Sequence, residues 1–596
     1  MLVGTPSMHL ETEPFPTQPR KVKRWLKELP LANTGETTRL LYQGLTELNR
    51  LRMPAYDRLE ILELLRPTRR LILDQLSRHF VSRSLPLPAR SQRIANINTD
   101  LLYEVAMGYL QVVREGSSGA NSLAPRHLAL GIHRAMRALA ERHFHAGRLY
   151  QPTPDGLWEQ AHWLYHLAEQ RQLVAQEIKD TELNGQRRST VAHTYKQMSL
   201  YSLADPLTLH QGDTDALTRY LEGSAQACAI TTSPVADNAD YLYVLDLSTD
   251  EPPAYVHGSE AGRHEAVRYL NLFPLIRQIR EELRANAQDA PGPLHRDIAA
   301  RVLQAWTNNA RRRFSRMSND GHVDVVLGIT AAHDMIRQAV NPAPQASMIG
   351  KAQERDRAFE ELSLERMSDS PRYESEGITV RYLADMPQDV TSNAWDTIAK
   401  GNLVTDRTTE DQSRALHPGK EAPVPTSWEI LDTSAGGFRL RWRGDVSVRA
   451  QVGELIALRD ATSGREHWRL GMVRWIRSPS NSGLEVGVKM LAPKAMPVDI
   501  SPVRHGRPMG RRVPGLLLPR IKVLEQHATL ACRAGLFEAG EQVAVTLAGR
   551  TLIVALSAIE TQSSLFTQFQ FRPAQSTAAP EGETSHKNTP LWPDIL

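Results

Sequence analysis

Three residues near position 430 have the types and the spacing of a small polar binding turn. Asp432, Ser434 and Gly437 form an Asp-x-Ser-x-x-Gly pattern that follows the apolar segment 427–431 and runs directly into a second strand-like segment. A carboxylate accepts hydrogen bonds from N–H groups, and a serine hydroxyl can donate to an anion. Glycine allows a close approach where a Cβ would clash. The same residue types also form ordinary turns between strands, so a purely structural turn is the alternative.

A run of arginines lies upstream of this turn. Residues 311–316 read Arg-Arg-Arg-Phe-Ser-Arg, so Arg312 and Arg316 have the spacing Arg-x-x-x-Arg, and Arg311 and Arg313 lie beside Arg312. Arginine forms bidentate hydrogen bonds to phosphate and to guanine O6 and N7, and it stacks on bases. A solvated basic helix end is the alternative, and the same spacing recurs elsewhere in this arginine-rich chain.

The order of these features resembles the PilZ family of small β-barrels, which bind the bacterial second messenger cyclic di-GMP. That family combines an upstream Arg-x-x-x-Arg with an Asp/Asn-x-Ser-x-x-Gly turn, and residues 322–327 supply the apolar strand between them. The resemblance covers about 311–330 and 426–491. It implies two sides of one ligand site: Arg311, Arg312, Arg313 and Arg316 on one side, and Asp432, Ser434 and Gly437 on the other. It also implies binding without catalysis, metal or cofactor.

The segments around the turn have the alternation of half-buried strands. Phe438, Leu440 and Trp442 alternate with arginines. In 484–490, apolar residues alternate with polar residues or glycine. Residues 340–425 are polar and strongly charged, which predicts a flexible insertion. We therefore expect one PilZ-like antiparallel barrel over 301–492, interrupted between its first and second strands, because closure of a long loop costs little extra free energy.

The rest of the chain predicts a multidomain α+β protein. Apolar residues at steps of three and four predict an N-terminal all-α region over 1–185. Residues 186–300 predict a degenerate, barrel-like segment with helices. Within it, 244–251 aligns with 430–437 but carries Glu251 in place of the final glycine, and a carboxylate there would repel phosphates. This copy is therefore expected not to bind.

The C-terminal part is expected to follow the barrel through a separate linker. Its prolines indicate a linker over 493–508. A strand-rich module is then expected over 509–572. Residues 573–596 are rich in Ser, Thr, Pro and Glu, which predicts a disordered tail.

The composition of the chain restricts the cellular compartment and the kinds of partner that we expect for it. The 596 residues include 71 Lys and Arg against 67 Asp and Glu, a net charge of +4, so the surface as a whole is not built for a polyanion. The two cysteines, Cys228 and Cys532, exclude a disulfide framework and indicate a reducing compartment. The sequence has neither a secretory signal nor an apolar run of about 20 residues. We expect a cytoplasmic protein without a membrane span.

The resemblance implies a bacterial cyclic-di-GMP receptor that is not an enzyme. Its output would be a contact with a protein of a motility, type IV pilus or biofilm system. Two alternatives stay open. One is a PilZ-like scaffold that binds no nucleotide and acts through its helical region. The other is a helical nucleic-acid-binding protein that uses the basic segment 20–93, although nucleic acid is the less favoured partner because no interleaved aromatic residues accompany this charge.

Overall fold

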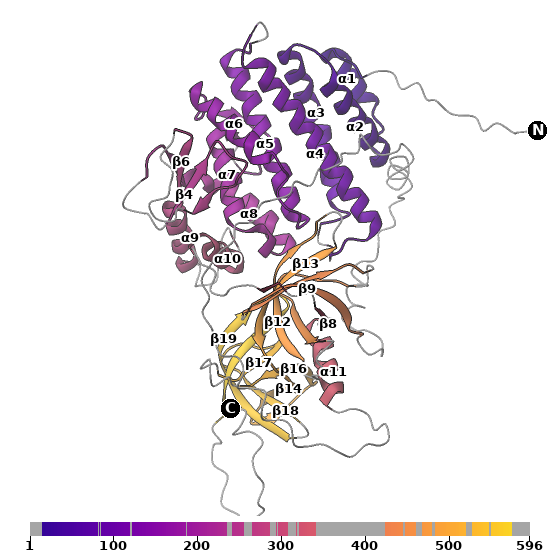
Figure 1. Ribbon diagram of the computed structural model, residues 1–596, viewed down its shortest axis with the longest axis vertical. Coiled ribbons are helices and arrows are strands. Elements are labelled where there is room, and N and C mark those ends of the chain that lie inside the picture. Colours follow the sequence, from indigo (N-terminus) through magenta and orange to yellow (C-terminus); the bar gives the residue numbers. More distant parts are fainter. Residues whose placement is uncertain are drawn as a thin grey trace, which may run out of the picture.

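A helical region and two β-barrels follow one another along the chain (Figure 1). The computed structural model describes residues 15–574 except 82, 84, 120–121, 186, 235–240, 256–264, 286–293, 295, 308–316, 319–320, 341–423, 435, 445–447, 461–467, 480–482, 520–526 and 548–549. In this described part of the chain, no helix is both long and apolar enough to cross a bilayer.

The N-terminal region is a bundle of helices, as the apolar spacing predicts. Its helices are α1 (Pro19–Glu28), α2 (Thr34–Arg50), α3 (Ala55–Ser77), α4 (Ala89–Gly116), α5 (Pro125–Arg148), α6 (Leu157–Gln170), α7 (Val191–Leu203) and α8 (Gln211–Ser224), with the short turns η1 (Pro206–Thr208) and η2 (Ala225–Ala227). A small hairpin, β1 (Ile178–Lys179) and β2 (Arg188–Ser189), separates α6 from α7. The helices therefore continue past residue 185.

Helix α5 lies at the centre of this bundle. Ala135, Met136 and Leu139 are fully buried, and nearly every other side chain of the helix is buried as well. A helix that is buried on all sides lies in the middle of a bundle, where neighbouring helices cover each face. Helices α4, α6 and α7 supply these neighbours.

Two carboxylates one turn apart on α4, Asp100 and Glu104, make the stability of the bundle depend on pH. Asp100 Oδ2 is buried without a hydrogen-bond partner among the described residues. Burial, and then the nearby Glu104, raises the pKa of Asp100 to about 7. The folded state therefore holds this proton more tightly than the unfolded state. The contribution of this proton to the free energy of unfolding is fully present below about pH 4 and is lost as the pH rises through about 7.

We therefore expect Asp100→Asn to stabilise the protein more at high pH than at low pH. The gain should be larger by about 2 kcal/mol at pH 8 than at pH 5, because the substitution removes a charge that only the high-pH folded state carries. Thermal unfolding of both proteins at the two pH values measures this. Equal effects at pH 5 and pH 8 would contradict it.

The first barrel closes across the long insertion. Its strands are β8 (His322–Leu327), β9 (Thr426–Ser434), β10 (Gly437–Trp442), β11 (Leu455–Asp460), β12 (Arg469–Arg477) and β13 (Leu484–Ala492), with the short β7 (Met317–Ser318) added beside β9. The barrel order is β8-β9-β10-β13-β12-β11, and all pairs are antiparallel. Val323 of β8 lies opposite Trp428 of β9, although more than a hundred residues separate them. The predicted split barrel is confirmed.

Side chains that point into this barrel alternate along the strand with side chains that point outward. Trp428, Leu440 and Trp442 are buried, while Arg439 and Arg441 point outward and are partly exposed. This is the two-residue period that the sequence predicts for β10. The predicted insertion, 340–425, falls almost wholly on residues 341–423, which lie outside the described part of the chain.

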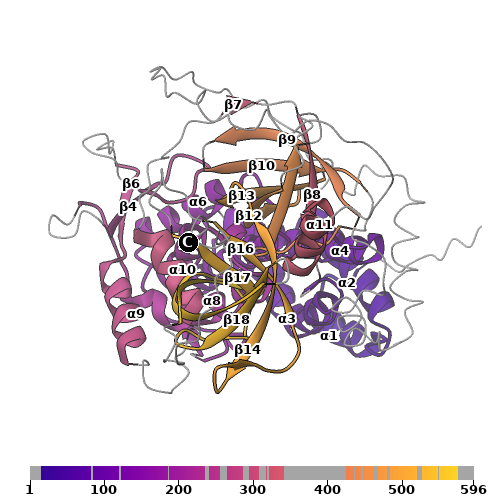
Figure 2. The same cartoon turned by 90° about the horizontal axis from the view of Figure 1, so that it is seen from below.

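Helix α11 (Ile329–Val340) follows β8 directly and joins the first barrel to the second. Its apolar residues Ile329, Ala332 and Ile336 pack in one cluster with Leu455 of the first barrel and Leu516 of the second. Seen from below, α11 lies beside β8 (Figure 2). The helix therefore covers part of the first barrel and leaves the outer face of β9, β10 and β13 to polar residues.

The second barrel occupies the C-terminal part. Its strands are β14 (Met496–Arg504), β15 (Arg507–Pro508), β16 (Val513–Leu518), β17 (Thr529–Arg533), β18 (Gln542–Leu547), β19 (Arg550–Gln562) and β20 (Phe566–Pro573), closed in the order β14-β16-β17-β20-β19-β18. The predicted linker over 493–508 is wrong, because β14 pairs there with both β16 and β18. Val498 and Ile500 alternate into the core of this barrel, and their burial outweighs the nearby prolines.

The segment between bundle and barrel differs from the predicted degenerate barrel. It contains helices α9 (Phe273–Ala285) and α10 (Arg296–Thr307) and the strands β3 (Ala229–Thr231), β4 (Leu242–Asp246), β5 (Ala254–Tyr255) and β6 (Val267–Asn271). The sheet order is β3-β6-β4-β5, and its edge strands are not paired with each other in the described part of the chain. The barrel-like prediction is therefore wrong, because these short strands form an open sheet beside helices.

Candidate ligand-binding face of the first barrel

One row of residues crosses four strands on the outside of the first barrel. Asp432 of β9 lies opposite Arg439 of β10, Arg439 lies opposite Gly487 of β13, and Gly487 lies opposite Trp475 of β12. Residues directly opposite in antiparallel strands point to the same face of the sheet. The four residues therefore form one continuous line, which we call the Asp432 row.

Two further rows flank the Asp432 row. On one side Ser434, Gly437 and Lys489 lie opposite one another across β9, β10 and β13. On the other side, the residues that lie opposite one another across the same strands are Glu429, Arg441 and Glu485. We call these three rows the polar face. The structure thus brings together the predicted residues Asp432, Ser434 and Gly437.

A buried carboxylate holds two arginines of the polar face. Glu485 is 3% exposed, and its two oxygens lie 2.8 Å from Arg439 Nη2 and 2.8 Å from Arg441 Nη2. Burial alone would raise the pKa of Glu485, but the hydrogen bonds from both arginines outweigh burial and lower it. Arg439 Nη1 also lies 3.8 Å from Asp432 Oδ2. Charge-assisted contacts of this kind fix the direction of a guanidinium.

Gly487 makes room for an aromatic side chain in the Asp432 row. A Cβ at this position would lie 1.9 Å from Trp475 Nε1, so the indole covers the glycine. Trp475 is partly exposed on this face. The row therefore offers a carboxylate, a guanidinium and an aromatic ring side by side, which are groups that recognise nucleobases by hydrogen bonds and stacking.

The packing of the strands requires a glycine at position 437, which the sequence pattern alone does not reveal. A Cβ there would lie 1.9 Å from the backbone oxygen of Val488 on β13. The glycine is therefore required for the close pairing of β10 with β13, whether or not a ligand approaches it.

The predicted arginines at 311–313 and 316 lie outside the described residues. The strand that follows them is described: in β7, Met317 lies opposite Thr433 and Ser318 lies opposite Asp432. The chain directly after the arginine run is therefore paired with the strand that carries the Asp-x-Ser turn.

Sequence reasoning missed four residues of this region: Arg439, Lys489, Trp475 and Glu485. The alternation of β10 identified Arg439 only as part of the solvent side of a strand. The signal that could have found the set is the register of β10 on β13 and of β13 on β12, which depends on a bulge in β12 between Val473 and Trp475. A bulge of this kind shifts the face on which later residues lie.

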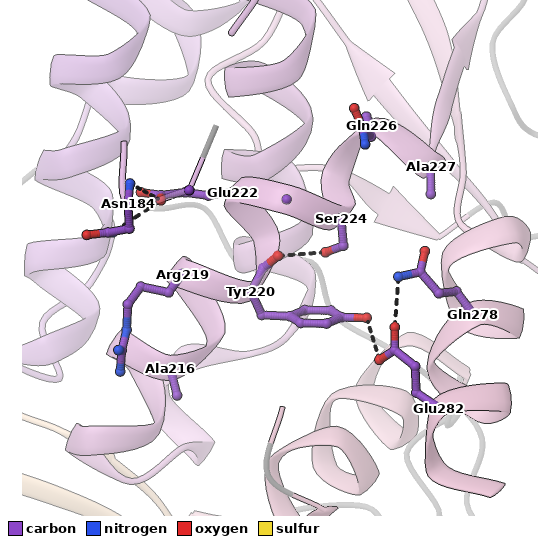
Figure 3. A pocket seen from close by; sticks show the side chains of 12 residues that line it. Asn184, Ala216, Arg219, Tyr220, Glu222, Ser224, Gln226, Ala227, Gln278 and Glu282 are labelled. Atoms are coloured by element: carbon purple, nitrogen blue, oxygen red, sulfur yellow. Dashed lines mark hydrogen bonds between the residues drawn. The ribbon is translucent and has the colours of Figure 1, made fainter. Parts of the chain in front are cut away.

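A cavity elsewhere in the molecule is less suited to an anionic ligand. It has a volume of about 760 Å³ and lies between α8, α9 and the loop at 184–185 (Figure 3). Glu222 and Glu282 line it beside Arg219, and Tyr220 donates a hydrogen bond to Glu282 at 3.1 Å. Two carboxylates would repel phosphates. Separately, the described residues contain no group of three His, Cys, Asp or Glu side chains that could hold a metal ion.

Comparisons with known proteins match the chain along almost its whole length. Residues 20–235 match the N-terminal domain of the cyclic-di-GMP receptor FimW, 242–497 match its middle PilZ domain, and 498–574 match its C-terminal β-barrel domain. The cyclic-di-GMP receptor FimW of Pseudomonas aeruginosa is 30% identical over 600 residues, which cover 96% of this chain and 95% of that protein. No solved structure matches the chain significantly.

Proposed function

This chain belongs to the FimW family of cyclic-di-GMP receptors with a middle PilZ domain, and from this premise we propose that it binds cyclic di-GMP on the polar face of its first barrel. The observation that carries the proposal is the register of β7 on β9, in which Ser318 lies opposite Asp432. Arg316 is bonded directly to Met317, and successive Cα atoms are about 3.8 Å apart. We therefore propose that Arg316, which directly precedes this pair of residues, acts at the turn.

The proposed roles follow from the chemistry of each side chain. Asp432 accepts hydrogen bonds from guanine N–H groups, and Ser434 donates to a phosphate. Arg312 and Arg316 clamp phosphates and guanine edges, assisted by Arg311 or Arg313. Lys489 is exposed in the row of Ser434 and adds positive charge for a ligand that carries two phosphates. These roles need neither a nucleophile nor a metal, so we propose binding rather than catalysis.

The helical region is proposed to receive the signal through β12. Trp475 lies in the Asp432 row, and three residues later Ser478 N donates to Tyr150 O of the helical region at 2.8 Å. Directly before Trp475 on the same strand, the charge of Arg474 interacts with Asp205 of the helical region. A ligand that favours one arrangement of β12 would thus shift the helical region as well. We propose that a cytoplasmic protein of a motility, pilus or biofilm system reads this change.

Three arginines of the basic segment 20–93 are not available to the nucleic acid of the alternative hypothesis. Arg58 is fully buried, and Arg66 and Arg69 are buried in ion pairs with Asp180, Glu141 and Glu182. Arginines held in this way are not available to neutralise phosphates, which is the main source of affinity for nucleic acid.

Calorimetric titration of the full chain with cyclic di-GMP tests the proposal. We expect the wild type to bind and both Asp432→Ala and Arg316→Ala to weaken binding by about 30-fold or more, since each removes a charged partner of a desolvated ligand group. Arg188→Ala is the control, because Arg188 lies on the β1–β2 hairpin in an exposed ion pair with Glu177.

Each result has a defined meaning. No binding by the wild type would overturn the receptor function and favour the scaffold alternative. Binding that survives both site substitutions would show that the ligand lies elsewhere. A loss in Arg188→Ala equal to that in Arg316→Ala would show that the effect of the Arg316 substitution reflects net charge alone.

A further inference from the structure

We propose that Arg439 reads a guanine base together with Asp432 and so makes the site specific for guanine over adenine. This inference rests on the proposed function and names a residue outside the Arg-x-x-x-Arg and Asp-x-Ser-x-x-Gly motifs. Arg439 and Asp432 are neighbours in the Asp432 row, with Nη1 and Oδ2 3.8 Å apart. Both side chains remain partly exposed, at 30% and 18%.

The hydrogen bonding of Arg439 is incomplete in the described part of the chain. Its Nη2 donates to Glu485 at 2.8 Å, whereas its Nε is buried and has no hydrogen-bond partner among those residues. The distance from Nη1 to Asp432 is an ion-pair contact and exceeds hydrogen-bond length. The buried Nε cannot reach a ligand, but Nη1 of this partly exposed side chain can donate hydrogen bonds to one.

Arg439 and Asp432 together present a pattern that guanine matches and adenine does not. Guanine O6 and N7 are acceptors that arginine contacts with two parallel hydrogen bonds. The adjacent N1–H and N2–H groups of the same base are donors, which a carboxylate can accept. Adenine instead has a donor at N6 and an acceptor at N1, so both protein groups would meet the wrong partner. A site built in this way rejects the wrong base because its polar groups would be left unpaired.

Glu485 is a positioning residue in this arrangement. It is nearly fully buried, and it binds Arg439 through one oxygen and Arg441 through the other. Arg441 lies in the next row, opposite Glu429, so it shares the same carboxylate without lying beside Asp432. The chain therefore contains a matched control: Arg441→Ala removes the same charge and the same kind of contact to Glu485.

The test compares cyclic di-GMP with cyclic di-AMP by calorimetry on the full chain. We expect Arg439→Ala to weaken cyclic di-GMP binding by about 5- to 150-fold, the range for loss of one bidentate base contact, and to change cyclic di-AMP binding little. The preference for guanine should fall by the same factor. Arg439→Lys keeps the charge and the stem but loses the planar fork, so it should lose the preference as well. Arg441→Ala should leave the preference unchanged.

Two results would overturn the inference while the proposed function stands. One is that Arg439→Ala and Arg441→Ala each weaken the binding of cyclic di-GMP and of cyclic di-AMP by the same factor. This would mean that Arg439 acts only through charge or structure. The other is a preference fully restored in Arg439→Lys. A wild type that binds neither dinucleotide would instead refute the proposed function itself. Melting curves of each variant identify any that fails to fold, and Arg439→Lys then gives the answer in place of Arg439→Ala.

Discussion

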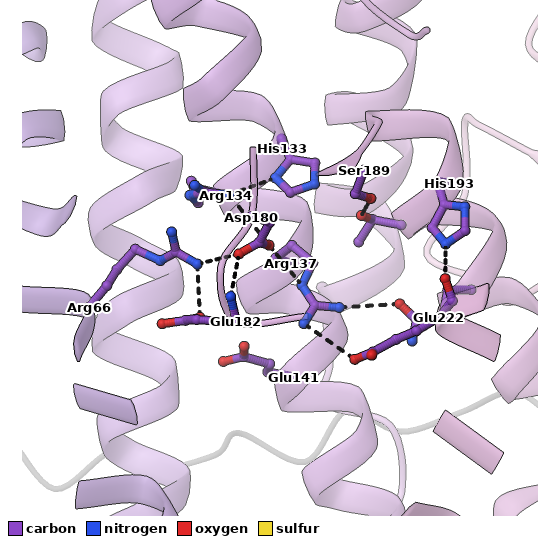
Figure 4. A network of polar contacts seen from close by, with 12 residues as sticks. Arg66, His133, Arg134, Arg137, Glu141, Asp180, Glu182, Ser189, His193 and Glu222 are labelled. Carbon is purple, nitrogen blue, oxygen red and sulfur yellow. Dashed lines mark hydrogen bonds and ion pairs between the residues drawn. The ribbon is translucent and has the colours of Figure 1, made fainter. Parts of the chain in front are cut away.

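An Asp180→Ala variant is expected to lose about 3 kcal/mol of unfolding free energy, because it leaves buried arginines without their shared carboxylate. Asp180 is 1% exposed, directly follows β1, and lies beside Arg66, Arg134 and Arg137 (Figure 4). Its Oδ1 lies 2.7 Å from Arg66 on α3, and its Oδ2 lies 3.4 Å from Arg134 and 3.8 Å from Arg137 on α5. One carboxylate thus ties the hairpin to two helices.

The size of this loss follows from what remains after the substitution. Removal of one partner of a buried ion pair costs about 3–5 kcal/mol, since the remaining charge is uncompensated. Arg66 and Arg134 also contact Glu63, at 3.4 Å and 3.0 Å, so part of their charge stays neutralised. The lower end of the range is therefore expected. Thermal and denaturant unfolding, followed through the helical signal of the full chain, measures it.

A neighbouring ion pair provides the control for Asp180→Ala. Glu177 on the same hairpin pairs with Arg188, and both side chains are more than half exposed. Glu177→Ala is therefore expected to change stability by less than about 1 kcal/mol. Equal effects of the two substitutions would contradict the assignment of the buried network as the stabilising contact.

The loss from Asp180→Ala is also expected to depend on pH. Burial alone would raise the pKa of Asp180, but Arg134, Arg66 and Arg137 outweigh burial and hold it well below its usual range. A lowered folded pKa gives stability that is present above the unfolded pKa of about 4 and is lost as the pH falls through the folded pKa. The difference in unfolding free energy between wild type and Asp180→Ala should therefore shrink as the pH falls below about 4.

The strands of the first barrel were predictable because each carries its own local signal. The alternation at Phe438, Leu440 and Trp442 identifies both the strand and its buried face. The pairing of β8 with β9 was predictable only with the family resemblance, since no local pattern joins strands on the two sides of residues 341–423. The strands of the barrel could thus be predicted from local patterns, and their pairing across the insertion from the strand order known for the family.

The errors arose where tertiary contacts override local composition. Prolines around β14 indicate a linker, yet Val498 and Ile500 bury enough surface to make it a strand. The strand β4 belongs to an open sheet, and the residue pattern of one strand does not say whether its sheet closes. The outer residues Arg439 and Trp475 depend on a bulge and on a glycine that another side chain covers, and neither is visible in a single sequence.

Gly437→Ala is expected to destabilise the first barrel by about 3 kcal/mol even without ligand, because a buried contact with no space must be forced apart. The added Cβ would lie 1.9 Å from Val488 O and 3.4 Å from Lys489 Cα. Both atoms belong to the backbone of β13, which pairs with β10 in register, Gly437 opposite Lys489. No side-chain rotation can relieve this contact, so the two strands must separate locally.

Comparison with a second substitution distinguishes this structural role from a role in ligand contact. Asp432→Ala should lose cyclic-di-GMP binding with a smaller loss of stability, whereas Gly437→Ala should lose both, since the polar face spans β10 and β13. Gly223→Ala is the control: it lies on α8 with nothing within 4 Å of an added Cβ, so it should be neutral or stabilising by up to about 1 kcal/mol. An unchanged melting temperature of Gly437→Ala, together with lost binding, would mean that the glycine serves the ligand alone.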